Sequence, residues 1–462
     1  MQDFFHFNGF TPWVFLVDMG LICALMLIGK LIRVKVKFVQ RLFIPPSLIA
    51  GLLGLVFGPN ALGVLPFSSN LSSYAAVLIA LVFATLPFSA AKTPMKEVVK
   101  RVGPMWVYAQ LGMLLQWGVM GLLGLYLFKS IWPELNSAFG AMLPTGFYGG
   151  HGTAAAIGTA YENLQGALRW EDAMTLGMTT ATAGVIFAIV GGLVIIKWGA
   201  KNHQTKFIAD FNELPPQLRT GLLPKEGREK LGEATTSSIS IEHLTFHFGI
   251  IFFVAALGYA ASVGVKNLCS NLQPPYSGME LPVFSCAFIV GLLLKRLFDA
   301  TKVSEYICNR TVQRQGSFFT DLLVAFGVAS IKIGVVVQYW LPLVLLIAIG
   351  AVVVFAITFY FGRHLSPSFW FERSIFAWGW WSGTMAMGIA LERIVDPQTK
   401  SGTMDDYALA YLPIAPVEII LITLIPIAFS AGWGALLMWL CLAIAFLLVL
   451  LAMRMRWWKK SK

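Results

Sequence analysis

The stretch Ala141–Thr159 reads AMLPTGFYGGHGTAAAIGT, and it decides the fold of this chain. It contains Pro144, a run of glycines and one histidine, His151. Proline removes a backbone donor and glycine lowers helix stability, so the sequence predicts an unwound backbone here. Two long apolar segments flank the stretch. Irregular backbone at membrane depth survives only where it is buried in protein or lines a wet cavity, so we expect a ligand site here.

The composition is that of a polytopic α-helical membrane protein. Of the 462 residues, 57% are hydrophobic and 12% are charged, a charged fraction well below that of soluble domains. The apolar blocks are long enough to cross a bilayer and too long for barrel strands. A net charge of +11 does not indicate nucleic-acid binding, because the basic residues lie in short loops between spans. The five cysteines are scattered without metal-ligand spacing and are expected to be reduced packing residues.

The apolar segments predict eleven membrane spans. They cover about 13–31, 42–65, 74–91, 105–128, 173–196, 246–265, 281–294, 318–337, 341–361, 407–429 and 433–453. The opening stretch falls between the fourth and fifth spans. A second broken stretch, Ser374–Ile394, falls between the ninth and tenth. We expect re-entrant hairpins at about 139–160 and 374–394.

The positions of the basic residues support this topology. With the N-terminus outside and both broken stretches re-entrant, all but four of the 34 Lys/Arg residues fall on the cytoplasmic side. Those four are Lys129, Arg169, Lys266 and Lys332. Counting either broken stretch as a full span would place the following basic loops outside. The pattern therefore predicts a cytoplasmic central linker and a cytoplasmic C-terminus.

The two halves of the chain resemble each other. Corresponding positions are Pro45 and Pro282, Gly54 and Gly291, and Gly152-Thr153 and Gly383-Thr384. Each half has five spans, an odd number, so the second half must be inserted upside down. The predicted units are an N-terminal inverted repeat at 1–200, a cytoplasmic linker at 201–244, a C-terminal inverted repeat at 245–432, and an extra transmembrane helix with a basic tail at 433–462. Inverted repeats with interrupted segments at matching positions are typical of secondary transporters.

The two hairpin tips form the predicted substrate site. Entering from opposite sides, they would meet near the membrane midplane, with free N–H groups for an anion and free carbonyls for Na⁺. The candidate substrate-binding residues are Gly149, Gly150, His151, Gly152, Thr153, Trp381, Ser382, Gly383 and Thr384. The alternative is that these small residues only allow close helix packing.

Four residues are candidates for ion binding or coupling: Asp321, Glu418, Thr175 and Thr179. Carboxylates inside a membrane are costly and mark function by default, and prolines just before Glu418 free backbone carbonyls. Either carboxylate would bind Na⁺ or take up a proton, and the alternative for each is a structural hydrogen bond. The threonines share one helix face and would either line the site or join helices.

No resident metal or cofactor is expected. His243 and His247 are spaced to share a helix face, but a zinc site needs a third protein ligand and none is near in sequence. The expected coupling ion is Na⁺, for which the hairpin tips offer free carbonyls, and H⁺ is the alternative.

The string Gly149–Thr153, GGHGT, followed by small residues and a Thr/Gly-rich span, resembles the bacterial sodium/glutamate symporter family. The segment Asp321–Lys332, DLLVAFGVASIK, is similar to that family's small-residue helix. The resemblance extends to about Phe429. It implies two inverted halves with re-entrant hairpins, an elevator-type carrier related in fold to citrate-type carriers, a homodimer in the bacterial inner membrane, and Na⁺-driven uptake of glutamate.

The chain departs from the family pattern at Gly379–Thr384, GWWSGT, where a second glycine-rich string with a histidine is usual. Glutamate or a similar small anionic amino acid or carboxylate is therefore the expected substrate, and a proton-coupled carrier of another organic anion is the alternative. An ion channel is a further alternative, but no repeated selectivity string is present. An enzyme is not expected, because His151 has only glycines, Tyr148 and Thr153 around it.

Overall fold

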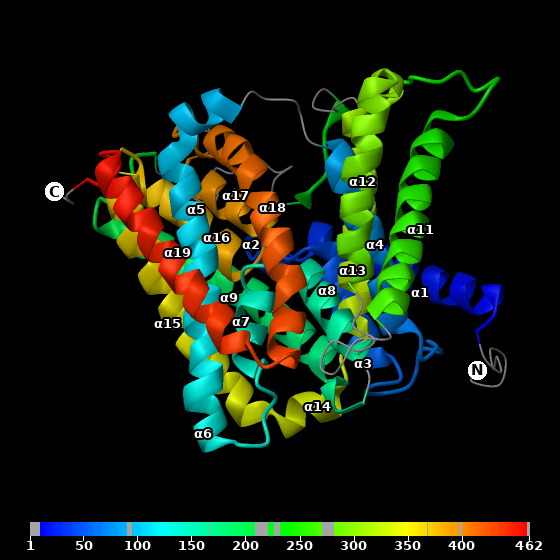
Figure 1. Ribbon diagram of the computed structural model, residues 1–462, viewed down its shortest axis with the longest axis horizontal. Coiled ribbons are helices and arrows are strands. Elements are labelled where there is room, and N and C mark those ends of the chain that lie inside the picture. Colours follow the sequence, from blue (N-terminus) through cyan, green and yellow to red (C-terminus); the bar gives the residue numbers. More distant parts are fainter. Residues whose placement is uncertain are drawn as a thin grey trace.

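The computed structural model describes residues 10–89, 95–164, 166–207, 220–225, 232–269, 281–366, 368–396 and 400–459. Throughout these residues the regular secondary structure is helical, with no β-strand (Figure 1). Parts of the predicted linker at 201–244 and the extreme ends of the chain lie outside the described residues.

Eight described helices are long and apolar enough to cross a membrane. They are α1 (Pro12–Lys35), α4 (Leu71–Ser89), α5 (Met95–Leu123), α9 (Ala173–Lys201), α11 (His243–Cys269), α15 (Trp340–Leu365), α18 (Thr403–Ser430) and α19 (Gly434–Arg454). The other three predicted spans are also helices, α3 (Pro46–Phe57), α12 (Val283–Ala300) and α13 (Asn309–Ala329). The shorter helices between them are α2 (Lys37–Arg41), η2 (Gly124–Phe128), α6 (Lys129–Ile131), η3 (Phe139–Ala141), η4 (Gly166–Leu168), η7 (Val303–Tyr306) and α14 (Ile333–Gln338).

The eighth predicted span does not run to residue 337 as one helix. It ends at Ala329, and α14 begins four residues later at Ile333. The Ser330 hydroxyl donates to the Gly327 carbonyl (2.8 Å), and the Ile331 N–H bonds to the Val328 carbonyl (3.2 Å). These bonds satisfy carbonyls that the helix end leaves without an intrahelical partner.

The helices form two bundles that stand side by side (Figure 1). Bundle one contains α1, α3, α4, α11, α12 and α13, with α13 packed between α3 and α4. Small residues permit the close approach: a Cβ on Gly51 would lie 2.6 Å from Val328, and a Cβ on Gly258 would lie 2.5 Å from the Ala287 backbone.

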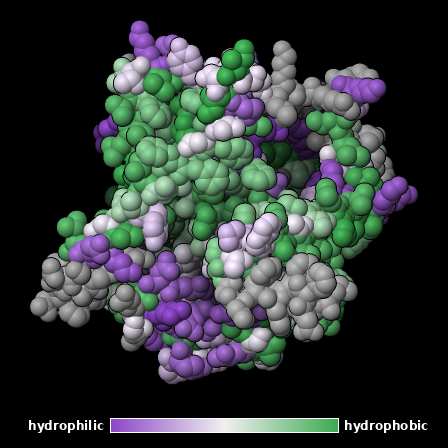
Figure 2. Space-filling view, turned by 90° about the vertical axis from the view of Figure 1, so that its right-hand side faces the viewer, coloured by the Kyte–Doolittle hydropathy of each residue, from purple (hydrophilic) through white to green (hydrophobic). Residues whose placement is uncertain are grey.

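Bundle two contains α5, α9, α15, α18 and α19, with α5 at its centre. Helix α19, the extra C-terminal helix, packs along α5, where Gly118 and Gly121 face Leu442 and Met438. Figure 2 shows the opposite side of the molecule, on which α1 and α11 of bundle one lie in Figure 1. Hydrophobic side chains cover a broad area of this face, and hydrophilic ones gather toward its edges. Such an apolar surface suits contact with lipid.

Both broken stretches are hairpins of two helices. The first pairs α7 (Met142–Gly146) with α8 (Gly150–Glu162), and the second pairs α16 (Trp370–Ser382) with α17 (Met385–Val395). The prediction of an unwound backbone is therefore wrong for most of each stretch, and it holds only for the short turns at 147–149 and 383–384. The reason is that buried backbone groups need partners, and a helix supplies them locally.

Packing within the second hairpin should depend on the absence of a side chain at Gly379. A Cβ there would lie 2.6 Å from the Gly388 backbone nitrogen. We expect Gly379→Ala to lower the free energy of unfolding by about 1–3 kcal/mol through overpacking. The measurement is the thermal unfolding midpoint in detergent. The matched control is Gly20→Ala on α1, where nothing lies within 4 Å, and equal midpoints for the two variants would contradict this packing.

Candidate functional site

The two hairpin turns meet. Gly150 has a positive φ of 63°, and a Cβ added there would lie 3.3 Å from the Gly383 carbonyl oxygen and 3.5 Å from Thr384 Cγ2. Glycine is needed at this position both for the left-handed backbone and for the close approach of the second hairpin. The structure thus brings together the two stretches that the sequence singled out more than 200 residues apart.

The ends of three helices converge at this contact. Helices α8 and α17 both begin there, and Thr384 caps α17 by accepting the Met387 N–H with its hydroxyl (3.4 Å). Helix α16 ends there, with the Gly379 carbonyl accepting the N–H groups of Gly383 and Thr384 (3.1 and 3.2 Å). Helix starts carry partial positive charge and helix ends partial negative charge, so the contact suits an anion together with a cation.

Helix α9 holds both hairpins in place. All four hairpin helices pack against it, and it presents glycines to the second hairpin. A Cβ on Gly184 would lie 2.3 Å from the Ser382 carbonyl oxygen, and Gly191 and Gly192 similarly face Trp378 and Leu391. The glycines that the sequence placed in the fifth span are therefore packing sites for the second hairpin.

His151 lies in the first turn of α8 and is 3% exposed. Its Nε2 is 3.2 Å from the Thr182 hydroxyl on α9, and that hydroxyl donates to the Met178 carbonyl (2.9 Å). Because the hydroxyl proton is engaged, His151 must donate from Nε2. The neighbouring Thr153 folds back over Gly149, where a Cβ would lie 2.2 Å from the threonine Cβ.

The two threonines predicted to bind ions make other contacts. The Thr179 hydroxyl donates to the Thr175 carbonyl (2.7 Å), and the Thr175 hydroxyl accepts the Lys332 N–H (3.4 Å). Thr175 therefore meets the junction between α13 and α14. Lys332 itself is exposed.

The intramembrane carboxylates have different surroundings. Asp321 is exposed on α13 in bundle one and interacts with Ser47 on α3. Glu418 is half-buried on α18 and accepts a hydrogen bond from the Tyr411 hydroxyl (3.4 Å). Asp18 is buried and accepts the Ser68 N–H (2.9 Å), the Ser68 hydroxyl and the Tyr74 hydroxyl (2.9 Å), so it is a structural group.

The two adjacent tryptophans of the second hairpin face different partners. The Trp381 ring packs against Gly112 and Tyr108 (ring centroids 4.7 Å apart), and its carbonyl accepts the Gln116 amide (3.3 Å). Trp380 is the one that faces the first hairpin, with its ring 5.4 Å from that of Tyr148. The sequence predicted Trp381 as part of the second hairpin tip, but helical geometry turns its side chain toward α5.

Sequence reasoning missed four aromatic residues close to the tips: Tyr148, Trp380, Tyr407 and Tyr411. Tyr407 and Tyr411 lie one turn apart on α18, and this spacing is only a weak indication in the sequence that the two rings share one helix face. Their approach to the first hairpin depends on how α18 packs, and no local pattern encodes that.

The two histidines near the start of α11 form hydrogen bonds with the segment before α11 and with the start of α13. His243 accepts the Thr235 N–H with Nδ1 (3.1 Å) and contacts the Thr311 hydroxyl with Nε2 (3.0 Å). His247 accepts the Cys308 N–H with Nε2 (2.9 Å). Among the described residues, no group of three or more His, Cys, Asp or Glu side chains is placed to hold a metal.

A family model described as sodium/glutamate symporter matches residues 15–364, more than half of the chain. The chain belongs to the sodium/glutamate symporter family. It is accordingly a multi-pass membrane transporter and not an enzyme. The match includes the whole first hairpin and stops before α16, so the second hairpin and α18 lie beyond the matched residues. No match was found among curated proteins.

The turn at Gly150 should be intolerant of a side chain. Gly150→Ala forces a left-handed backbone that costs about 1–2 kcal/mol and presses on Gly383. We expect transport to fall by about tenfold or more. The measurement is the initial uptake rate per folded protein. The control is Gly63→Ala, at a loop glycine with a φ of 65° and nothing within 4 Å of an added Cβ, and an equal loss in both variants would contradict a special role for the turn.

The His151–Thr182 bond should orient the histidine at the first tip. Thr182→Val removes the acceptor and leaves the His151 N–H buried without a partner, so we expect a several-fold loss of uptake. Thr182→Ser keeps the hydroxyl and should retain most activity. Uptake rates that are the same in the two variants would show that the hydrogen bond is dispensable.

Proposed function

We propose that the protein is a secondary active transporter that couples Na⁺ to the symport of glutamate, or of a similar small anionic amino acid or carboxylate. The site is the contact between the two hairpin turns. The single observation that carries this proposal is the approach of Gly150 to Gly383 and Thr384, because it joins two helix starts and one helix end at one point.

In this site the substrate carboxylates would bind at the starts of α8 and α17, near Gly149–Thr153 and Thr384. Na⁺ would bind carbonyl oxygens freed where α16 ends, near Trp381–Gly383. Asp321, Thr175 and Thr179 remain sequence-based predictions for coupling, since their hydrogen bonds and contacts are made with other partners.

We also propose that the chain is two inverted five-helix repeats followed by one extra helix. The support lies in matched details. Pro45 and Pro282 both precede a helix in an extended conformation, with ψ of 139° and 138°. Their helices pack in matching ways, α3 against α13 and α12 against α4. Transport would proceed as an elevator motion of one bundle past the other, with α8 in contact with both.

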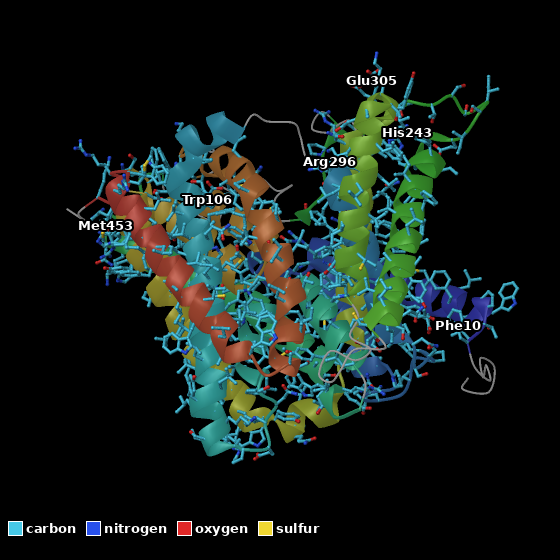
Figure 3. All side chains as sticks on the ribbon, viewed as in Figure 1. Phe10, Trp106, His243, Arg296, Glu305 and Met453 are labelled. Atoms are coloured by element: carbon cyan, nitrogen blue, oxygen red, sulfur yellow. The ribbon has the colours of Figure 1, made fainter. Side chains whose placement is uncertain are left out.

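The proposed setting is a homodimer in the bacterial inner membrane, with the N-terminus outside and the linker and C-terminus inside. Figure 3 shows His243, Arg296 and Glu305 at one end of bundle one, the end that the charge pattern assigns to the cytoplasm.

The function is tested with purified full-length protein in proteoliposomes. We expect an inward Na⁺ gradient to drive glutamate uptake above the gradient-free level, with saturation in substrate. Replacing external Na⁺ with choline at fixed pH should abolish that uptake. Uptake that survives choline and follows an imposed pH gradient would support the proton-coupled carrier instead, and non-saturable flux without acceleration by substrate on the opposite side would support a channel.

A further inference from the structure

Glu418 is a carboxylate inside the membrane span, and no described residue offers it a cationic partner. It lies on α18, where its hydrogen bond is to the Tyr411 hydroxyl at 3.4 Å. No described Lys, Arg or His side chain forms an ion pair with it. Asp18, a structural carboxylate, differs in accepting three hydrogen bonds. Their donors are the Ser68 N–H, the Ser68 hydroxyl and the Tyr74 hydroxyl. A lone long hydrogen bond leaves Glu418 undercompensated, which is costly at this depth.

Aromatic rings stand around this carboxylate. Tyr407, Tyr411 and Glu418 share one face of α18 by their spacing. The Trp380 ring of α16 lies 4.7 Å from Tyr407 and 6.4 Å from Tyr411, and it also contacts Tyr148 of the first hairpin. Aromatic faces attract organic cations and exclude water from the charges they surround.

Two buried hydroxyls in this cluster have no hydrogen-bond partner within the described part of the chain. The Oη atoms of Tyr148 and Tyr407 accept and donate no hydrogen bond, although both side chains are 3% exposed. Both rings pack on Trp380, and Tyr407 also packs on Tyr411, the residue that donates to Glu418, with ring centroids 5.6 Å apart. Buried polar atoms without partners are rare, and each needs an explanation. Here the three undersatisfied groups come from two separate elements, a hairpin turn and α18.

We propose that Glu418, Tyr148 and Tyr407, with the Trp380 ring, form a subsite for the substrate's ammonium group. An ammonium has three N–H donors, and the cluster offers one carboxylate and two free hydroxyl oxygens. A proton on Glu418 would supply one donor, enough for only one of the two hydroxyl oxygens. Na⁺ would need about six oxygen ligands, which an aromatic cluster does not supply.

The position of the subsite fits a single amino-acid substrate. Tyr148 directly precedes Gly149 and Gly150, where α8 begins, and Trp380 stands two residues before the end of α16. The ammonium subsite therefore adjoins the helix starts proposed to take the carboxylates. This inference rests on the proposed function, and it makes the substrate an amino acid and not a simple dicarboxylate.

The test compares glutamate with glutarate, which has the same two carboxylates and no amine. Binding of each to the full-length protein in detergent is measured by calorimetry at a fixed, saturating Na⁺ concentration. We expect the wild type to favour glutamate by about tenfold or more. In Glu418→Gln that preference should fall to near one, because glutamate binding weakens while glutarate binding is retained.

Two further variants keep the test valid if the Glu418→Gln protein fails to fold. Tyr148→Phe and Tyr407→Phe each remove an unpartnered buried hydroxyl, so the unfolding midpoint should not fall. Each should still lower the preference for glutamate over glutarate several-fold. The matched control is Tyr339→Phe, which removes a hydroxyl bonded to Asp172 (3.1 Å) and should leave the preference unchanged.

The outcomes separate this inference from the function on which it rests. A wild type that binds and transports neither compound contradicts the proposed function and the subsite with it. A wild type that binds both compounds equally well contradicts the ammonium subsite alone. So does an equal loss for both compounds in Glu418→Gln, which is the result expected if Glu418 instead held a coupled proton or Na⁺.

Discussion

The hydrocarbon core of a membrane contains no water to hydrogen-bond the backbone groups that an interrupted helix leaves free, and the arrangement of this protein depends on that constraint. Helices α8 and α17 begin inside the protein, and α16 ends there, at one shared contact. Each break leaves backbone groups that no helix can satisfy. The fold keeps the breaks short, two or three residues each, and brings them together at one contact. In the proposed function, the backbone groups left over at this contact would bind the substrate and its ion.

Glycines, which carry no side chain, allow the two hairpins to pack closely against each other and against their neighbouring helices. Glycines on α9 admit the second hairpin, Gly112 on α5 receives the flat face of Trp381, and Gly379 and Gly388 let α16 and α17 lie backbone to backbone. In lipid there is no hydrophobic force between helices, so close packing of small residues is a principal source of association. The same glycines that weaken isolated helices are the ones that fix the hairpins against α9.

The second hairpin and α18 lie beyond the residues matched by the family model. The family match ends at residue 364, before both elements. They carry Trp380, Tyr407, Tyr411 and Glu418. Trp380 contacts Tyr148 of the first hairpin, Tyr407 packs on Trp380, and Tyr411 packs on Tyr407 and donates to Glu418. The proposed site thus combines the first hairpin, which lies inside the family match, with residues that lie beyond it.

The sequence by itself determined the membrane class, the helical spans, the two interrupted stretches and the transporter family, because hydrophobic length and glycine-proline breaks are local properties of the chain. It also named Gly150 and Gly383-Thr384, since a break needs such residues. The predicted breaks were too long, because a buried backbone forms helix to satisfy its own hydrogen bonds. Only the tertiary structure decided that Trp381 faces α5, that Trp380 faces the first hairpin, and that Glu418 stands among tyrosines. Those facts depend on the rotation of each helix about its axis, and packing against neighbours distant in sequence sets that rotation.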